Sequence, residues 1–158
     1  MLLFGILLFL FPFGISCSSN SSKKTQTSDN GLTSENEKTK VIYATIGETK
    51  MKIDLEDNSS SEALVEILKK KDITYIAHNY GDFEKVGSIG YTLPQNDKSI
   101  TTNPGDVILY QGTSICFYYD TNTWSFTKIG KINEYSKEEL RSILKANEGN
   151  ITIMLSIS

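Results

Sequence analysis

Aromatic side chains that could contact a ligand are concentrated in the second half of the sequence, beside turns and polar loops. Tyr91 lies in a short extended segment, and Trp124 directly follows a polar loop. Partly exposed aromatic rings at a loop rim offer a large contact area at a small cost in conformational entropy. We therefore predict that Tyr91 and Trp124 contact a peptide or a small ligand, with Gln111 and Asn79 as polar neighbours.

Residues suited to catalysis or metal binding are scarce. His78 is the only histidine, and no nucleophile-elbow motif accompanies it, so a serine–histidine–aspartate triad is not expected. A single histidine without a nearby pair of thiolates also argues against a zinc site. No glycine-rich loop of the phosphate-binding kind precedes a predicted helix. We expect no catalytic residue, no metal and no cofactor.

The net charge and the cysteine content argue against nucleic-acid binding and against a disulfide. The net charge of -3 argues against a nucleic-acid binder, because such proteins usually carry a basic stripe that neutralises phosphates. The two cysteines are Cys17 and Cys116. Cys116 lies in an apolar segment and is predicted to be a small buried residue, not half of a disulfide.

The first 16 residues are almost wholly apolar and too short to span a bilayer comfortably as a helix. They fit the apolar region of a secretory signal peptide. Small residues before Cys17 resemble a bacterial lipobox, although Gly14 stands where leucine is usual and no basic residue lies near Met1. We predict a signal peptide in residues 1–16 and lipidation of Cys17. The alternatives are an ordinary cleaved signal peptide or an uncleaved anchor.

Residues 18–40 are rich in Ser, Thr, Asn, Lys and Glu and contain almost no large apolar side chain. Such a segment cannot bury enough surface to offset its ordering entropy, so a disordered tether is predicted. Together with the lipidated Cys17, it would hold a folded domain of residues 41–158 at the cell envelope, after secretion across the cytoplasmic membrane. The membrane would then be a partner through the lipid anchor.

The folded part is predicted to consist mainly of short strands. Residues 103–132 hold three apolar runs separated by turn residues, which predicts an antiparallel meander. Alternating apolar positions predict further strands in residues 41–47, 51–55, 72–80 and 151–157. A loop is expected in residues 81–87, a short extended piece in 89–94 and a polar loop in 95–102.

Two helices are predicted from their capping signals. Ser59 with Glu62, and Ser136 with Glu139, have the spacing of a capping box. Each is followed by an apolar stripe at helical spacing, and the first helix is expected to end near Lys70. About eight strands with two helices over the open ends favour a closed, largely antiparallel β-barrel, which would leave no sheet edge exposed.

Alternation along the second run of the meander assigns each side chain to a face of this barrel. Phe117 and Tyr119 are expected to point inward, while Tyr118 points outward beside Cys116. Phe117 and Phe126 are predicted to fill the barrel interior.

Four segments occur in an order that resembles the bacterial cyclophilin-like domain family: GYTLP in residues 90–94, NPGDVILY in 103–110, FYY in 117–119 and WSFTKIGKI in 124–132. The resemblance covers roughly residues 40–158. It implies a compact cyclophilin-like β-barrel, whereas the family has no settled biochemical activity.

The resemblance suggests prolyl isomerisation only by analogy of fold. Cyclophilins that catalyse it use an arginine in a groove on the barrel face. The only arginine here, Arg141, follows Leu140 in the second predicted helix and is expected to point to water. We therefore expect a non-catalytic module that binds a peptide or a small ligand. The alternative is a prolyl isomerase or another envelope enzyme on the same barrel.

Overall fold

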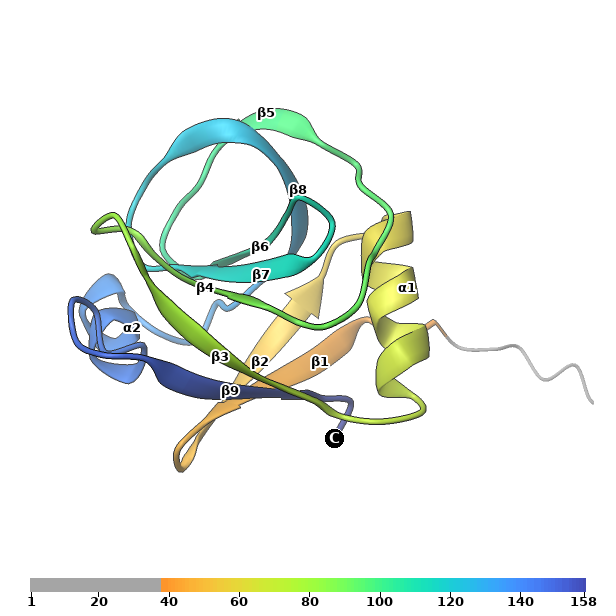
Figure 1. The fold of residues 1–158 in the computed structure, drawn as a ribbon, viewed down its shortest axis with the longest axis horizontal. Helices are drawn as coiled ribbons and strands as arrows, with labels where there is room; N and C mark the ends of the chain where they lie inside the picture. Colours follow the sequence, from red (N-terminus) through yellow and green to blue (C-terminus); the bar gives the residue numbers. More distant parts are fainter. Residues whose placement is uncertain (1–37) are drawn as a thin grey trace, which may run out of the picture. The chain divides into compact units, whose positions relative to one another are not determined.

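The computed structural model describes residues 38–158, which form nine strands and two helices (Figure 1). In chain order they are β1 (Val41–Ile46), β2 (Thr49–Leu55), α1 (Ser59–Leu68), β3 (Ile73–Tyr80), β4 (Glu84–Ser88), β5 (Lys98–Thr101), β6 (Asp106–Tyr110), β7 (Ser114–Tyr118), β8 (Thr123–Lys131), α2 (Lys137–Ile143) and β9 (Ile151–Ser156). The predicted signal peptide, Cys17 and the tether up to residue 37 lie outside the described residues. No helix in the described part is long and apolar enough to cross a membrane.

Eight of the strands close into an antiparallel barrel. Their order is β2-β1-β9-β3-β4-β7-β6-β8, and a further pairing between β2 and β8 completes the circuit. The ninth strand, β5, lies outside this circuit and pairs with β8. The predicted closed barrel of about eight strands is confirmed.

A glycine permits closure at the β2–β8 seam. Gly130 stands opposite Leu55 in the ladder, and a Cβ atom at this position would lie 2.5 Å from the carbonyl oxygen of Asp54. Any side chain would therefore push the two strands apart at the point where the barrel closes.

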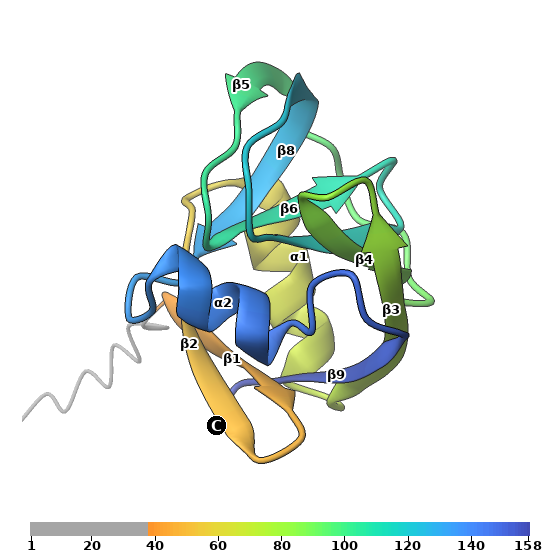
Figure 2. The same cartoon turned by 90° about the vertical axis from the view of Figure 1, so that its left-hand side faces the viewer.

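Apolar side chains from alternate strand positions fill the barrel, and the helices supply the rest of the core. Leu64 and Leu68 of α1, and Leu140 and Leu144 at α2, are buried in the same cluster as the inward residues of the strands. Figures 1 and 2 show the two helices on opposite sides of the barrel. The two predicted helices are thus confirmed.

The helix starts follow their capping side chains. Asn58, not Ser59, is the N-cap of α1, because its side chain accepts from the backbone N–H groups of Ser60 and Ser61, each at 3.0 Å. An asparagine side chain is among the best acceptors at this position. The capping box of α2 is present as predicted, between Ser136 and Glu139.

Three local predictions are wrong. Residues 84–88 form β4 instead of lying in a loop, and the short strand before the meander is β5 at Lys98–Thr101 instead of residues 89–94. The three apolar runs do not form a meander, because β8 pairs with β6 and not with β7. Pairing partners depend on contacts between segments far apart in the chain, which local pattern does not record.

The strand β8 bends where its partners change. A register shift between Val107 and Ile108 of β6 leaves one extra residue in β8, which is the signature of a β-bulge. The part of β8 that precedes Thr127 does not pair with β6 but with β5, so that Trp124 stands opposite Ile100. Figure 1 shows this half of β8 curving away from the barrel with β5 beside it. The curved segment forms a wall over the outer face of β6 and β7.

Candidate functional site

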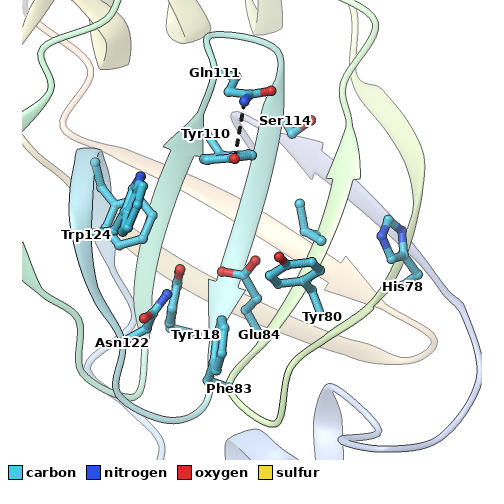
Figure 3. A pocket seen from close by; sticks show the side chains of 12 residues that line it. His78, Tyr80, Phe83, Glu84, Tyr110, Gln111, Ser114, Tyr118, Asn122 and Trp124 are labelled. Atoms are coloured by element: carbon cyan, nitrogen blue, oxygen red, sulfur yellow. Dashed lines mark hydrogen bonds between the residues drawn. The ribbon is translucent and has the colours of Figure 1, made fainter.

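A cleft of about 540 Å³ opens on the outer face of the barrel, across β3, β4, β6, β7 and β8. Twelve side chains line it: His78, Tyr80, Phe83, Glu84, Val86, Tyr110, Gln111, Ser114, Tyr118, Asn122, Trp124 and Phe126 (Figure 3). Its size falls within the usual range of small-molecule sites, about 300–1,000 Å³.

The floor of the cleft is a small apolar cluster separate from the barrel core. Its buried members are Val86, Ile108, Cys116, Tyr118 and Phe126. They lie on β4, β6, β7 and β8, on the opposite face of the sheet from the barrel core. Tyr118 and Cys116 therefore point outward, as predicted. Phe126 is buried, but the prediction that it fills the barrel interior is wrong, because β8 has already left β6 at this residue.

Aromatic rings form a continuous series through the cleft. The ring of Phe83 stacks on that of Tyr118, with centroids 5.9 Å apart and an angle of 9° between the planes. Tyr80 meets the edge of Phe83 at 6.0 Å, and Phe126 meets Tyr118 at 5.8 Å. Such offset and edge-on pairs stabilise one another beyond the area they bury. The series gives the cleft a preformed aromatic surface.

Three aromatic side chains at the rim are exposed to water. Tyr80, Tyr110 and Trp124 are 62%, 38% and 64% exposed, and they come from β3, β6 and β8. The side-chain amide of Gln111 donates to the Tyr110 hydroxyl at 3.2 Å. Exposed aromatic residues gathered around one cleft are a feature of binding surfaces.

Glu84 places a carboxyl group among these rings. Figure 3 shows its carboxyl near the middle of the cleft, between Tyr118 and Tyr80. The side chain is only 6% exposed, and its Oε2 atom has no hydrogen-bond partner. Burial raises the pKa of Glu84 above its ordinary value, while the nearby Tyr118 hydroxyl and Cys116 thiol oppose this rise. Both groups lie close to the carboxyl, yet they leave Oε2 without a hydrogen bond of ordinary geometry.

The two groups beside Glu84 are held in their neutral forms. Burial raises the pKa of Tyr118, and its interaction with the Glu84 carboxyl raises it further. Burial also raises the pKa of Cys116 well above its ordinary value. Cys116 is a free, buried cysteine, as predicted. A thiol with a raised pKa is a poor nucleophile, so its role is packing and not covalent chemistry.

Polar contacts fix the chain that carries the wall of the cleft. The Thr127 hydroxyl donates to Asp97 at 2.5 Å and accepts from the backbone N–H of Asn96 at 2.7 Å. Thr127 is fully buried at the point where β8 turns away from β6. These bonds tie the segment before β5 to β8 and so position Trp124.

The structure brings two of the three predicted ligand contacts together. Gln111 and Trp124 both line the cleft. Tyr91 is exposed but does not line it. Asn79 serves elsewhere, since its side chain donates to the carbonyl of Glu148 and accepts from the Tyr119 hydroxyl.

The most buried polar residue of the cleft escaped the sequence-based reasoning. Glu84 lies in a run with Lys85 and two glycines, which is typical of a loop. In the structure, Glu84 and Lys85 are both buried on opposite faces of β4. Gly87 accounts for the close approach of β3, because a Cβ atom there would lie 2.2 Å from the carbonyl oxygen of Ile76. The sequence of Glu84–Ser88 shows no alternation of apolar and polar residues, so no local signal indicated this strand.

The remaining candidate groups lie outside catalytic arrangements. His78 lines the cleft from the exposed face of β3. Arg141 does not simply point to water, because its guanidinium lies 5.0 Å from the centre of the Tyr119 ring. Across residues 38–158, no three His, Cys, Asp or Glu side chains are grouped so that they could hold a metal ion.

Comparisons with known proteins agree with this architecture. A solved structure of a hypothetical protein from Archaeoglobus fulgidus superposes with a TM-score of 0.57 at 16% identity, over 79% of this chain and 99% of that one. At this identity the likeness concerns the fold alone. None of the curated proteins matches the chain. The sequence model of the Cyclophilin-like family matches residues 44–156, and the chain therefore belongs to the Cyclophilin-like family.

Proposed function

We propose that the domain of residues 41–158 is a binding module that holds a peptide or a small ligand in the cleft shown in Figure 3. One observation carries this proposal: three exposed aromatic side chains surround a cleft whose lining includes the buried carboxyl group of Glu84. Sites for small ligands are mostly apolar, with a few polar groups that fix the orientation of the ligand. The proposal assigns Gln111 and Trp124 to the ligand and leaves Tyr91 outside the contact.

The chain supplies its own reporter for a ligand screen. Trp124 is the only tryptophan and lines the cleft, so its fluorescence should change when a ligand binds there. Trp124→Ala is expected to weaken binding by about tenfold, the scale of losing one aromatic contact. Tyr91→Ala is the matched control, because it removes an exposed aromatic ring outside the cleft. If calorimetry finds the same affinity in Trp124→Ala for every ligand that the screen identifies, the cleft is not the binding site.

We also propose that this module is lipid-anchored at the cell envelope through Cys17. The support is the apolar segment of residues 1–16 and the lipobox-like residues before the cysteine. Replacement of Cys17 by serine is expected to release the protein from the membrane fraction. Membrane association that persists in Cys17→Ser would rule out the lipid anchor.

Prolyl isomerisation is the competing function, and no feature of the cleft favours it. Among its lining residues there is no arginine, and Arg141 lies over the Tyr119 ring. A peptide isomerisation assay on the purified protein decides between the two functions, since clear turnover would contradict a purely binding role.

A further inference from the structure

The Glu84 carboxyl is the polar group of the cleft that the chain itself does not satisfy. Its side chain is buried, and Oε2 has no hydrogen-bond partner in residues 38–158. A buried acceptor without a donor costs roughly 1–3 kcal/mol, and more when it is charged. Native structures keep few such groups, and each calls for an explanation such as a bound ligand or ion. Oε2 itself is shielded from water, so a donor from outside the chain would reach the carboxyl through its other oxygen, Oε1, on the side that lines the cleft (Figure 3).

The side chains around Glu84 favour a donor that carries a positive charge. Tyr80 and Tyr118 are its direct cross-strand neighbours on β3 and β7, and Phe83 stacks on Tyr118. The faces of aromatic rings carry negative potential and attract cations. No lysine or arginine lines the cleft, and His78 is its only basic side chain. A buried carboxyl and a set of aromatic rings thus create a negative potential that no lysine or arginine of the lining offsets.

We propose that the cleft binds an organic cation, an ammonium or guanidinium group that donates to Glu84 and packs against the surrounding aromatic rings. This inference rests on the proposed function, because it names the chemistry of the ligand that the module holds. A charged donor makes a stronger hydrogen bond to a carboxylate than a neutral donor does. An anionic ligand would instead face the carboxyl and the ring faces with like charge.

Two sources could supply this cation: a lysine or arginine side chain of a peptide, or a free amine. The cleft is larger than a single ammonium group requires. The exposed rings of Tyr110 and Trp124 flank it on β6 and β8 and could contact the groups on either side of the cation.

The test uses the full chain, purified in a mild detergent, and calorimetric titration with four probes. Three are acetylated, amidated tripeptides with alanine on both sides of a central lysine, arginine or norleucine, and the fourth is free spermidine. Norleucine keeps the apolar stem of lysine and lacks its charge. The lysine or arginine peptide is expected to bind about tenfold or more tightly than the norleucine peptide, which is the scale of a hydrogen bond to a charged group. Glu84→Gln is expected to abolish this difference.

Glu138→Gln is the matched control, because it removes one acidic charge from an exposed position on α2, away from the cleft. It is expected to bind the probes as the unmodified protein does. Spermidine that binds with the same dependence on Glu84 assigns the cation to a free amine, whereas binding of the basic peptides alone assigns it to a peptide side chain.

The outcomes separate this inference from the proposed function. Equal affinity for the norleucine and lysine peptides would overturn the cationic ligand while leaving a binding cleft in place. A preference for basic probes that persists in Glu84→Gln would also overturn it, because the charge would then be recognised elsewhere. If none of the four probes binds, the cationic inference fails, and the wider ligand screen still decides the proposed function.

Discussion

Glu84 and Tyr118 stand directly opposite each other on β4 and β7, so both side chains project from the same outer face of the barrel. On the other side, Tyr80 of β3 stands directly opposite Glu84. Directly opposed residues of antiparallel strands have Cβ atoms roughly 4.5–5.5 Å apart. The ladder of β3, β4 and β7 therefore places one carboxyl group between two phenol rings.

The first prediction concerns the stability cost of Glu84. The pKa of this carboxyl is raised in the folded protein, mainly by burial, so the native state holds its proton to a higher pH than the unfolded chain does. The contribution of Glu84 to the free energy of unfolding is therefore most favourable below the pKa of this carboxyl in the unfolded chain. It is lost as the pH rises through its pKa in the folded protein. Glu84→Gln should be more stable than the unmodified protein at pH 8 by roughly 1 kcal/mol. The difference should shrink toward pH 4.5.

Urea unfolding at several pH values measures this difference directly. Comparing the two proteins isolates Glu84, because exposed acids such as Glu66 and Asp120, whose pKa values are lowered by their lysine partners, contribute equally to both. If Glu84→Gln is less stable than the unmodified protein at pH 8, the buried carboxyl does not destabilise the fold. Greater stability combined with lost binding is the behaviour expected of a residue kept for function.

A second prediction follows for the pH dependence of cation binding. The affinity for the lysine peptide should rise with pH as Glu84 loses its proton, and it should level off above the folded pKa of that carboxyl. The groups that face Glu84 are Tyr118 and Cys116 on β7, Tyr80 and His78 on β3 and Tyr110 on β6. The raised pKa values of Tyr118 and Cys116 keep both neutral over this range.

His78 is the basic side chain of the cleft lining. His78→Gln therefore serves as the control, and calorimetry between pH 5 and 8 is the measurement. An affinity profile that keeps its shape in His78→Gln assigns the titration to Glu84. A profile that becomes flat in this variant would assign it to the histidine instead.

The third prediction tests the seam that closes the barrel. Gly130→Ala should destabilise the protein by about 1–3 kcal/mol, the usual cost of forcing extra volume into a packed site. The physical reason is the carbonyl oxygen of Asp54, which lies 2.5 Å from where the new Cβ atom would be. Gly149→Ala is the matched control, because nothing lies within 4 Å of the corresponding Cβ position.

Chemical denaturation of the two glycine variants provides the comparison. Gly149→Ala is expected to stay within about 0.5 kcal/mol of the unmodified protein, as most surface substitutions do. Equal stability of the two variants would mean that the seam relaxes without cost.

The fourth prediction concerns the ion pairs at the start of β6. The buried carboxylate of Asp106 lies 3.1 Å from Lys128 and 3.0 Å from Lys131, and it accepts from the backbone N–H of Asn103 at 2.8 Å. Asp106→Asn should cost about 2–3 kcal/mol, because it leaves two half-buried lysines without their common partner. Thermal and urea unfolding both measure this loss.

An exposed ion pair supplies the contrast for Asp106. Glu66 and Lys69 lie 2.7 Å apart on the surface of α1, where water screens their attraction. Glu66→Gln is expected to change stability by less than about 0.5 kcal/mol. If Asp106→Asn and Glu66→Gln lower the free energy of unfolding by the same amount, burial does not strengthen the ion pairs of Asp106.

Local sequence pattern predicts a strand or a helix start correctly where the residues that carry the signal are near neighbours in the chain. The alternation of Met51 and Ile53 with lysines marks β2, and the capping box of Ser136 with Glu139 marks the start of α2. Each signal arises from interactions between near neighbours in the chain, namely alternate side chains on one strand and a side chain bonded to the backbone three residues on. The barrel followed from counting such elements.

Only the tertiary structure decided which strands pair and which polar groups become buried. β8 pairs with β6, which is not the strand next to it in sequence order. Glu84 is buried on β4 between its cross-strand neighbours Tyr80 of β3 and Tyr118 of β7. Its sequence context, a charged pair between glycines, resembles that of an exposed loop. Burial depends on everything packed around a residue, and residues from five strands and the connections between them build this cleft. The sequence therefore determined the barrel and the aromatic residues that could bind a ligand, while the fold decided that a carboxyl group lies among them.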